Sequence, residues 1–149
     1  MELEPFTGIL TIVVFTPLAG AMLILLTARK DSLIRLMALS VTLFNFVLSG
    51  IIFVIFDESS SQRFQMIDRF EWFNSQAIDV TYQMGVDGIS APLVLLTGLL
   101  GFIAVLASWK IVLRVKEYFV WILVLQTAVM GVFTSLDFIL FFVFWELEL

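Results

Sequence analysis

The chain has 149 residues, of which 61% are hydrophobic and 14% charged, and its formal net charge is −5. Soluble domains are about 45–50% apolar and about 25% charged, so this composition is typical of an integral membrane protein. The chain has no cysteine and no histidine, which excludes disulfides, thiolate-bound iron–sulfur clusters, histidine-ligated haem and the common zinc sites within these residues. There is no glycine-rich nucleotide-binding motif, and the few scattered basic residues argue against nucleic acid as a partner.

The first two predicted membrane helices cover residues 6–28 and 33–56. The acidic residues before the first helix do not match the basic start of a cleavable signal peptide. Pro17 removes one backbone N–H near the middle of that helix, which predicts either a hinge or, as we favour, a notch for packing. Asn45 lies near the centre of the second helix and is expected to form a hydrogen bond to another helix; a hydrated path is the alternative.

Residues 57–85 form the one long polar segment, and we predict an extracytoplasmic loop there. Within it, residues 64–73 mix aromatic and apolar side chains with charges, so this part is expected to lie on the membrane surface as a hairpin or a helix. The third predicted helix follows at residues 89–109, with Ser90 as its N-cap. Asp87 is interpreted as a partner of the helix dipole, and a site at the mouth of a pathway is the alternative.

Small residues recur at three- and four-residue spacing along the third helix, and they predict the close approach of a neighbouring helix. These residues are Gly98, Gly101, Ala104 and Ser108. The fourth predicted helix covers residues 118–134 and has Gln126 as a polar residue near its middle.

The charged residues also predict an orientation in the membrane. Six of the eight lysine and arginine residues lie within residues 29–35 and 110–116, and alternating crossings place these two segments on the same side. The positive-inside rule assigns this side to the cytoplasm. The N-terminus and the acidic segment 57–85 are therefore expected on the outside.

The last segment, residues 136–149, contains our candidate functional residue. Eight consecutive apolar or aromatic residues follow Asp137 and precede Glu146. In a helix that starts at Leu136, Glu146 lies about 15 Å from the start, near the midplane of a hydrocarbon core about 30 Å thick. Ionisable residues at that depth usually mark a proton or ion route.

This segment is too short to cross a bilayer, because it reaches only about 21 Å as a helix and a crossing needs about 20 residues. The predicted fold class is therefore an all-α integral membrane protein with four full transmembrane helices and a truncated fifth. We expect residues 1–149 to be the N-terminal part of a polytopic membrane domain, a fragment cut inside the fifth helix. A short interfacial anchor is the alternative, and the lack of a polar face along residues 138–145 disfavours it.

Two stretches of the sequence resemble one known family. Residues 136–149, which include Phe-Val-Phe-Trp-Glu-Leu-Glu-Leu, are similar to the fifth transmembrane helix of the antiporter-like chain 4 (chain M) of proton-pumping NADH-quinone oxidoreductase, respiratory complex I. The runs Gly-Val-Asp-Gly-Ile-Ser and Pro-Leu-Val-Leu-Leu-Thr-Gly within residues 85–98 resemble the start of that chain's third helix. The Trp-Glu-Leu-Glu-Leu form is closest to the photosynthetic-type version. Residues 1–84 agree only in their pattern of helices.

The resemblance implies a role for one residue. In the family, the glutamate of the Trp-Glu pair is the intramembrane acid of a proton channel, and it pairs with a lysine on the seventh helix. This role falls on Glu146 as the proton-carrying carboxyl, and the lysine lies outside the chain. Glu148 points about 200° away from Glu146 in a helix, so no role is carried over to it. Without the remaining helices, these residues alone are expected to be inactive.

The resemblance implies a proton-translocating membrane subunit of an NADH (or ferredoxin):quinone oxidoreductase, which couples quinone reduction to proton pumping. The implied partners are the other membrane subunits and the lipid bilayer, in a bacterial plasma membrane or a thylakoid-type membrane. NADH, FMN, iron–sulfur clusters and quinone would belong to other subunits, so no cofactor or metal is expected in this chain. A subunit of a multi-subunit cation/proton antiporter and a small membrane scaffold are the alternative functions.

Overall fold

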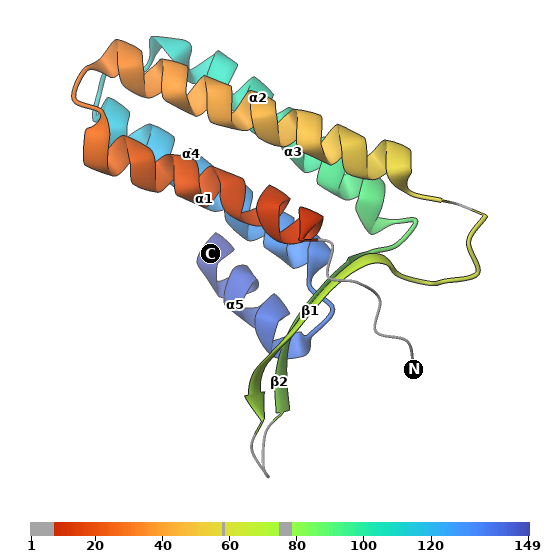
Figure 1. Cartoon of the computed structure of the whole chain (residues 1–149). Helices are drawn as coiled ribbons and strands as arrows, with labels where there is room; N and C mark the ends of the chain where they lie inside the picture. The colour runs from red at the N-terminus through yellow and green to blue at the C-terminus, as the bar shows by residue number, and fades with distance from the viewer. Residues whose placement is uncertain (1–7, 58, 75–78) are drawn as a thin grey trace.

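The computed structural model describes residues 8–57, 59–74 and 79–149 (Figure 1). Its helices are α1 (Ile9–Thr27), α2 (Asp31–Ile55), α3 (Ser90–Ala107), α4 (Val115–Thr134) and α5 (Phe138–Glu148), with a short 3-10 turn at Ser108–Lys110 after α3. Two antiparallel strands, β1 (Gln65–Asn74) and β2 (Asp79–Val86), form a hairpin that extends from one end of the long helices.

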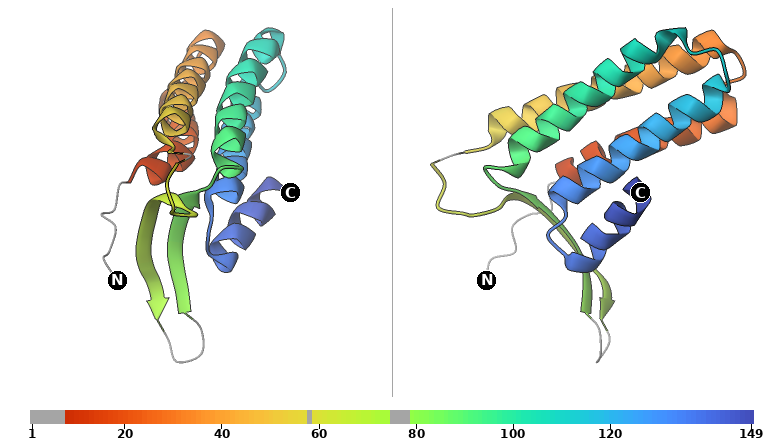
Figure 2. Two further views of the ribbon diagram at one scale, coloured as in Figure 1. Left: turned by 90° about the vertical axis from the view of Figure 1, so that its right-hand side faces the viewer. Right: turned by 180° about the vertical axis from the view of Figure 1, so that it is seen from behind.

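The four long helices form a bundle. Helix α1 packs against α2 and α4, and α3 packs against the same two helices, so α1 and α3 occupy opposite corners (Figure 2). By length and composition, each of the four can cross a membrane. Many large apolar side chains on the outside of the bundle are exposed, which is the arrangement that a hydrocarbon environment favours. The expectation of four full membrane helices and a shorter fifth is confirmed.

The starts of α2, α4 and α5 differ from those predicted by two or three residues. Helix α2 begins at Asp31, inside the predicted connection. Helix α4 begins at Val115 and not at residue 118, directly after Arg114, whose left-handed backbone (φ 48°) turns the chain into the helix. Helix α5 begins at Phe138, two residues later than predicted. The orientation with the N-terminus outside stays a prediction.

The segment predicted as an extracytoplasmic loop contains the β-hairpin, so the chain has a small sheet beside its helices. The sequence of β2 is typical of a strand, because apolar residues alternate with polar or small ones. The apolar residues are Val80, Tyr82, Met84 and Val86. Met84 and Val86 are fully buried. Residues 65–74 form one strand of this hairpin, so the helix alternative for residues 64–73 is wrong. The position of the hairpin on the membrane surface stays a prediction.

The start of α3 corrects the assignment of its N-cap. The carboxylate of Asp87 accepts hydrogen bonds from the backbone N–H of Ser90 (2.7 Å) and of Ile89 (3.0 Å). The Ser90 hydroxyl accepts a return bond from the backbone N–H of Asp87 (2.9 Å). Asp87 is thus the capping side chain, as interpreted, and Ser90 is the first residue of the helix. The bond from the Ser90 N–H, more than any other factor, holds the pKa of Asp87 below its ordinary value.

The interpretation of the small residues on α3 is confirmed. A methyl group on Gly98 would overlap the hydroxyl of Ser49 on α2, and one on Gly101 would overlap the side-chain amide of Gln126 on α4. These two glycines therefore permit close packing of α3 against two different helices. Ser108, further along the same row, forms a hydrogen bond with the hydroxyl of Tyr118 at 2.8 Å.

A chain of side-chain amides crosses the bundle and explains how Pro17 is accommodated. Pro17 lies inside α1 and is buried. Because proline has no backbone N–H, the carbonyl of Val13 four residues earlier loses its helical donor. Asn45 Nδ2 donates to this carbonyl at 2.5 Å, and Gln126 Nε2 donates to Asn45 Oδ1 at 3.1 Å. This arrangement confirms that Asn45 bridges helices, whereas the packing role of Pro17 stays a prediction.

Replacing Asn45 with leucine is expected to lower the free energy of unfolding by about 1–2 kcal/mol, because two buried polar groups lose their partner. The substitution Pro17→Ala restores an N–H that can bond to the Val13 carbonyl. In that background the cost of Asn45→Leu should fall by about 1 kcal/mol. A double-mutant cycle, measured by reversible denaturation in mixed micelles, tests this coupling. Strictly additive effects of the two substitutions would contradict it.

Candidate functional site

Helix α5 carries the predicted site residue Glu146. The start of α5 lies beside the hairpin (Figure 2). In the connection from α4, the backbone N–H of Leu136 donates to the carbonyl of Gln83 at 2.9 Å, and Ser135 pairs with Met84 in a β-bridge. The next residue, Asp137, caps α5: its carboxylate accepts from the backbone N–H groups of residues 139 and 140 at 2.9 and 3.1 Å. These contacts fix where α5 begins.

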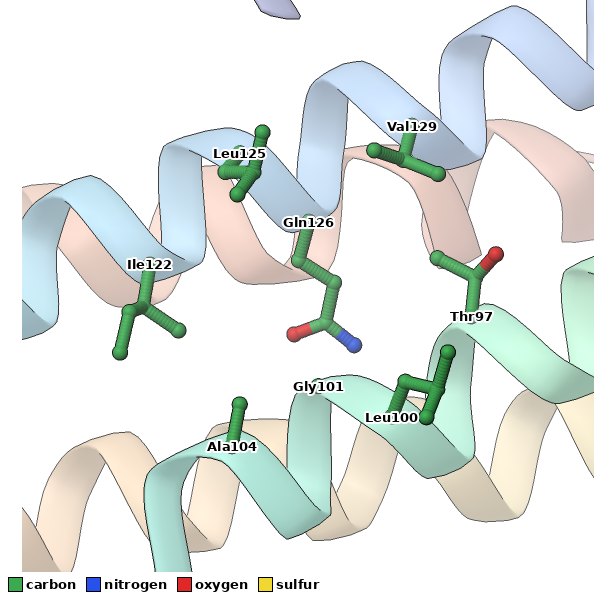
Figure 3. A pocket seen from close by; sticks show the side chains of 8 residues that line it. All are labelled: Thr97, Leu100, Gly101, Ala104, Ile122, Leu125, Gln126 and Val129. Carbon is green, nitrogen blue, oxygen red and sulfur yellow. The ribbon is translucent and has the colours of Figure 1, made fainter. Parts of the chain in front are cut away.

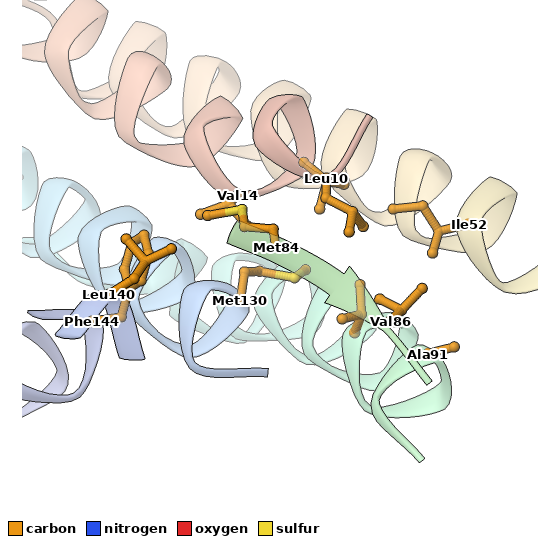
Figure 4. Close-up of a cluster of buried hydrophobic side chains, with 11 residues drawn as sticks. Leu10, Val14, Ile52, Met84, Val86, Ala91, Met130, Leu140 and Phe144 are labelled. Atoms are coloured by element: carbon orange, nitrogen blue, oxygen red, sulfur yellow. The ribbon is translucent and has the colours of Figure 1, made fainter. Parts of the chain in front are cut away.

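The rotation of α5 about its axis is set by two buried side chains, Leu140 and Phe144. The Phe144 ring lies against Gly131 of α4, where a methyl group would overlap the ring. The same ring lies 6.1 Å, centroid to centroid, from that of Phe15 on α1. Leu140 and Phe144 belong to a hydrophobic cluster that also includes Met84 of β2 (Figure 4). One face of α5 is therefore packed against α1, α4 and the hairpin.

Glu146 lies on a different face of α5. It follows Phe144 by two residues, so its side chain is rotated by about 200° from that of Phe144, and it is exposed. Glu148 is rotated by only about 40° from Phe144 and is exposed near the end of the helix. Because α5 starts at Phe138, Glu146 lies about 12 Å from the helix start, about 3 Å less than the sequence suggested.

The side chains around Glu146 are apolar. Val143, Trp145 and Leu147 are exposed on the same stretch of α5, and residues 138–148 include no lysine or arginine. A carboxylate among apolar side chains on a membrane helix is costly unless other protein groups or water surround it. The group can bind and release a proton, and any cation that pairs with it has to come from outside α5. The proton-carrying role of Glu146 stays a prediction.

A buried carboxylate, not singled out from the sequence, lies where the hairpin meets α1. Asp68 in β1 is fully buried. One of its oxygens accepts from the backbone N–H of Gly8 at 2.6 Å, and the other accepts from the backbone N–H and the hydroxyl of Thr11, both at 2.9 Å. Asp68 therefore caps the start of α1 from a distant part of the chain.

Tyr82 of β2 extends this contact. Its hydroxyl donates to the Thr11 hydroxyl at 2.9 Å. Burial raises the pKa of Tyr82, the bond to Thr11 partly offsets this, and the negative charge of Asp68 raises it further. Asp68, Thr11 and Tyr82 together attach both strands of the hairpin to α1, and we call these three residues the hairpin clamp.

The fold and the site together define a multi-pass membrane protein with a carboxylate on a short apolar helix. No family model matches the chain. The chain is 38% identical to NAD(P)H-quinone oxidoreductase chain 4-3 of Nostoc sp., over 94% of this chain and 25% of that protein. It is 36% identical to NAD(P)H-quinone oxidoreductase chain 4 2 of Thermosynechococcus vestitus (94% and 26%) and 38% identical to the chloroplastic chain 4 of Chara vulgaris (94% and 28%).

The homologues of this chain are thus NAD(P)H-quinone oxidoreductase chain 4 proteins of cyanobacteria and chloroplasts, which confirms the resemblance seen in the sequence. The chain spans about a quarter of the length of these relatives. Its fold is similar to part of the membrane-bound sulfane sulfur reductase, an archaeal respiratory membrane complex, with a TM-score of 0.72 and 21% identity. That match covers 94% of this chain and 21% of the other, and it concerns the fold alone.

Proposed function

We propose that the chain forms part of the membrane arm of an NADH (or ferredoxin):quinone oxidoreductase and takes part in proton translocation coupled to quinone reduction. The observation that carries this proposal is the homology to NAD(P)H-quinone oxidoreductase chain 4 along 94% of the chain. The position of Glu146 on an apolar helix adds to it, because intramembrane carboxyls usually serve proton or ion routes.

In this proposal, the packing of α5 presents Glu146 to the neighbouring membrane helices of the complex. Phe144 holds one face of α5 against Gly131 of α4, so Glu146, on another face, is directed away from that contact. In general, a carboxyl group removed from water holds its proton, and a cation brought beside it favours release. A cationic partner that alternates between two positions would therefore make Glu146 take up and release a proton in turn.

The redox chemistry would take place in other subunits, which would hold NADH or ferredoxin, FMN, the iron–sulfur clusters and quinone. This chain would contribute positioning and one titratable group. Its partners would be the other membrane subunits of the complex and the surrounding lipid.

Affinity purification of the tagged chain from its native membrane, in mild detergent, tests this function. We expect iron–sulfur subunits to copurify, with their paramagnetic signals and with quinone reduction by NAD(P)H or ferredoxin. An untagged strain grown in parallel is the control. Recovery of membrane chains alone, free of iron–sulfur subunits and active in cation/proton exchange, would instead establish the antiporter and overturn the proposal.

A further inference from the structure

The chain of amides through the bundle ends in an acceptor without a partner among the described residues. Val13 offers only a carbonyl, so Asn45 must present its NH₂ group there and its oxygen to Gln126. Gln126 therefore uses its own NH₂ group toward Asn45, which leaves Oε1 as the terminal acceptor. Gln126 is 4% exposed, and its Oε1 is buried with no hydrogen-bond donor in the described part of the chain. Burying an acceptor without a hydrogen-bond donor costs about 1–3 kcal/mol of stability, and a donor that reaches it recovers this cost.

Gln126 lines a pocket between α3 and α4, with a volume of about 230 Å³. Figure 3 shows its side-chain amide directed from α4 toward Gly101 of α3. Ala104 and Ile122 also line the pocket, and the exposed side chains of Leu100 and Leu125 border it. The pocket lies near the middle of both helices. It therefore combines an apolar wall, access from the side of the bundle and one buried acceptor, Gln126 Oε1, which a bound donor reaches when the Gln126 side chain shifts toward the pocket.

We propose that this pocket binds a lipid-soluble alcohol or phenol, whose single hydroxyl donates to Gln126 Oε1 while its carbon body contacts the apolar wall. A buried water molecule typically makes about three hydrogen bonds. Among the side chains that line the pocket, Gln126 Oε1 and the hydroxyl of Thr97, whose own proton is donated to the Leu93 carbonyl, offer a water molecule two acceptors, and the rest of the space would stay unfilled. An apolar body with one donor satisfies the acceptor and also fills the apolar space.

The hydrogen bond gives the site its selectivity. An analogue that replaces the hydroxyl with a methyl group keeps the shape but leaves Gln126 Oε1 without a donor. One such bond changes affinity by about tenfold. This inference does not depend on the proposed function, because it uses no contact of Glu146 or α5.

The test uses the full chain in lipid nanodiscs with ¹⁵N-labelled glutamine side chains. p-Cresol is the probe, and p-xylene is its isosteric control without a hydroxyl. We expect p-cresol to shift the amide signal of Gln126 in a saturable manner, and p-xylene to bind about tenfold more weakly. The signal of Gln126 is assigned by its loss in Gln126→Leu.

Two variants separate the acceptor from the volume of the pocket. Gln126→Leu removes the acceptor, so this variant should bind p-cresol no more tightly than p-xylene, as measured on the methyl signals of the two probes. Ala104→Leu fills the pocket while leaving the amide chain intact, and it should abolish the saturable shift of the Gln126 amide by p-cresol. Ala107→Leu, the same change on an exposed residue of α3 outside the pocket, should leave binding unchanged. Equal affinity for the two probes, or binding that survives Ala104→Leu, would overturn the proposal. So would a water cross-peak to the Gln126 amide that persists at saturating p-cresol.

Discussion

Replacing Glu146 with glutamine is expected to lower proton pumping and the coupled quinone reductase activity of the assembled complex by about a hundredfold, the lower end of what removal of a proton-transfer group costs. Glutamine preserves the size and hydrogen-bonding capacity of the side chain but cannot bind and release a proton near neutral pH. The measurement is the quenching of a pH-sensitive dye in native membrane vesicles during NAD(P)H- or ferredoxin-driven quinone reduction.

Glu148→Gln is the matched control for this experiment. It makes the same chemical change two residues further along α5, on a face about 200° away. We expect a much smaller loss, with assembly of the complex unchanged in both variants. Equal losses from the two variants would remove the reason for distinguishing Glu146. Free labelling of a cysteine at position 146 by a water-soluble reagent in the intact complex would contradict its assignment to the membrane interior.

The second large effect is expected at the hairpin clamp. Asp68→Ala removes the acceptor of three donors at the start of α1, two backbone N–H groups and the Thr11 hydroxyl. We expect the free energy of unfolding to fall by about 2–3 kcal/mol, the range for a helix cap with charge-assisted hydrogen bonds. Reversible denaturation in mixed micelles measures the loss. Hydrogen exchange at the Thr11 backbone amide should accelerate more than exchange in the middle of α1.

Two further variants make this result interpretable. Glu71→Ala removes an exposed carboxylate from the same strand and should change stability by less than about 0.5 kcal/mol. Asp68→Asn keeps one side-chain oxygen as an acceptor and should recover part of the loss. If Asp68→Ala and Glu71→Ala have equal effects, the carboxylate of Asp68 does not stabilise the fold through these contacts.

The sequence predicted the membrane helices well because their signal is local. A run of about twenty apolar residues specifies a helix wherever its neighbours lie. The sequence of residues 57–85 does not specify one fold, because its signal is not local. The charged residues in β1 weaken its alternation, and the pairing of β1 with β2 shifts by one residue between Gln65 and Asp68. A register shift of this kind changes which side chains face the core.

The functional residues differ in the same way: some are visible in the sequence, and others are recognised only in the fold. Glu146 was found because a charge after eight apolar residues is unusual in a single sequence. Asp68 was missed because it is one of several acidic residues in a polar segment, and only the fold brings it to Gly8 and Thr11. The bond between Asn45 and Gln126 likewise depends on the contact between α2 and α4. The sequence indicated that both residues needed polar partners but not that they were each other's partner.

The hairpin is attached at two places, and this has a mechanical consequence. Asp68 ties β1 to the beginning of α1, while Gln83 ties β2 to the turn that leads into α5. Because both attachments lie at the start of a helix, the strands connect the beginning of α1 to the beginning of α5, and a displacement of the hairpin would disturb the first turns of both helices together.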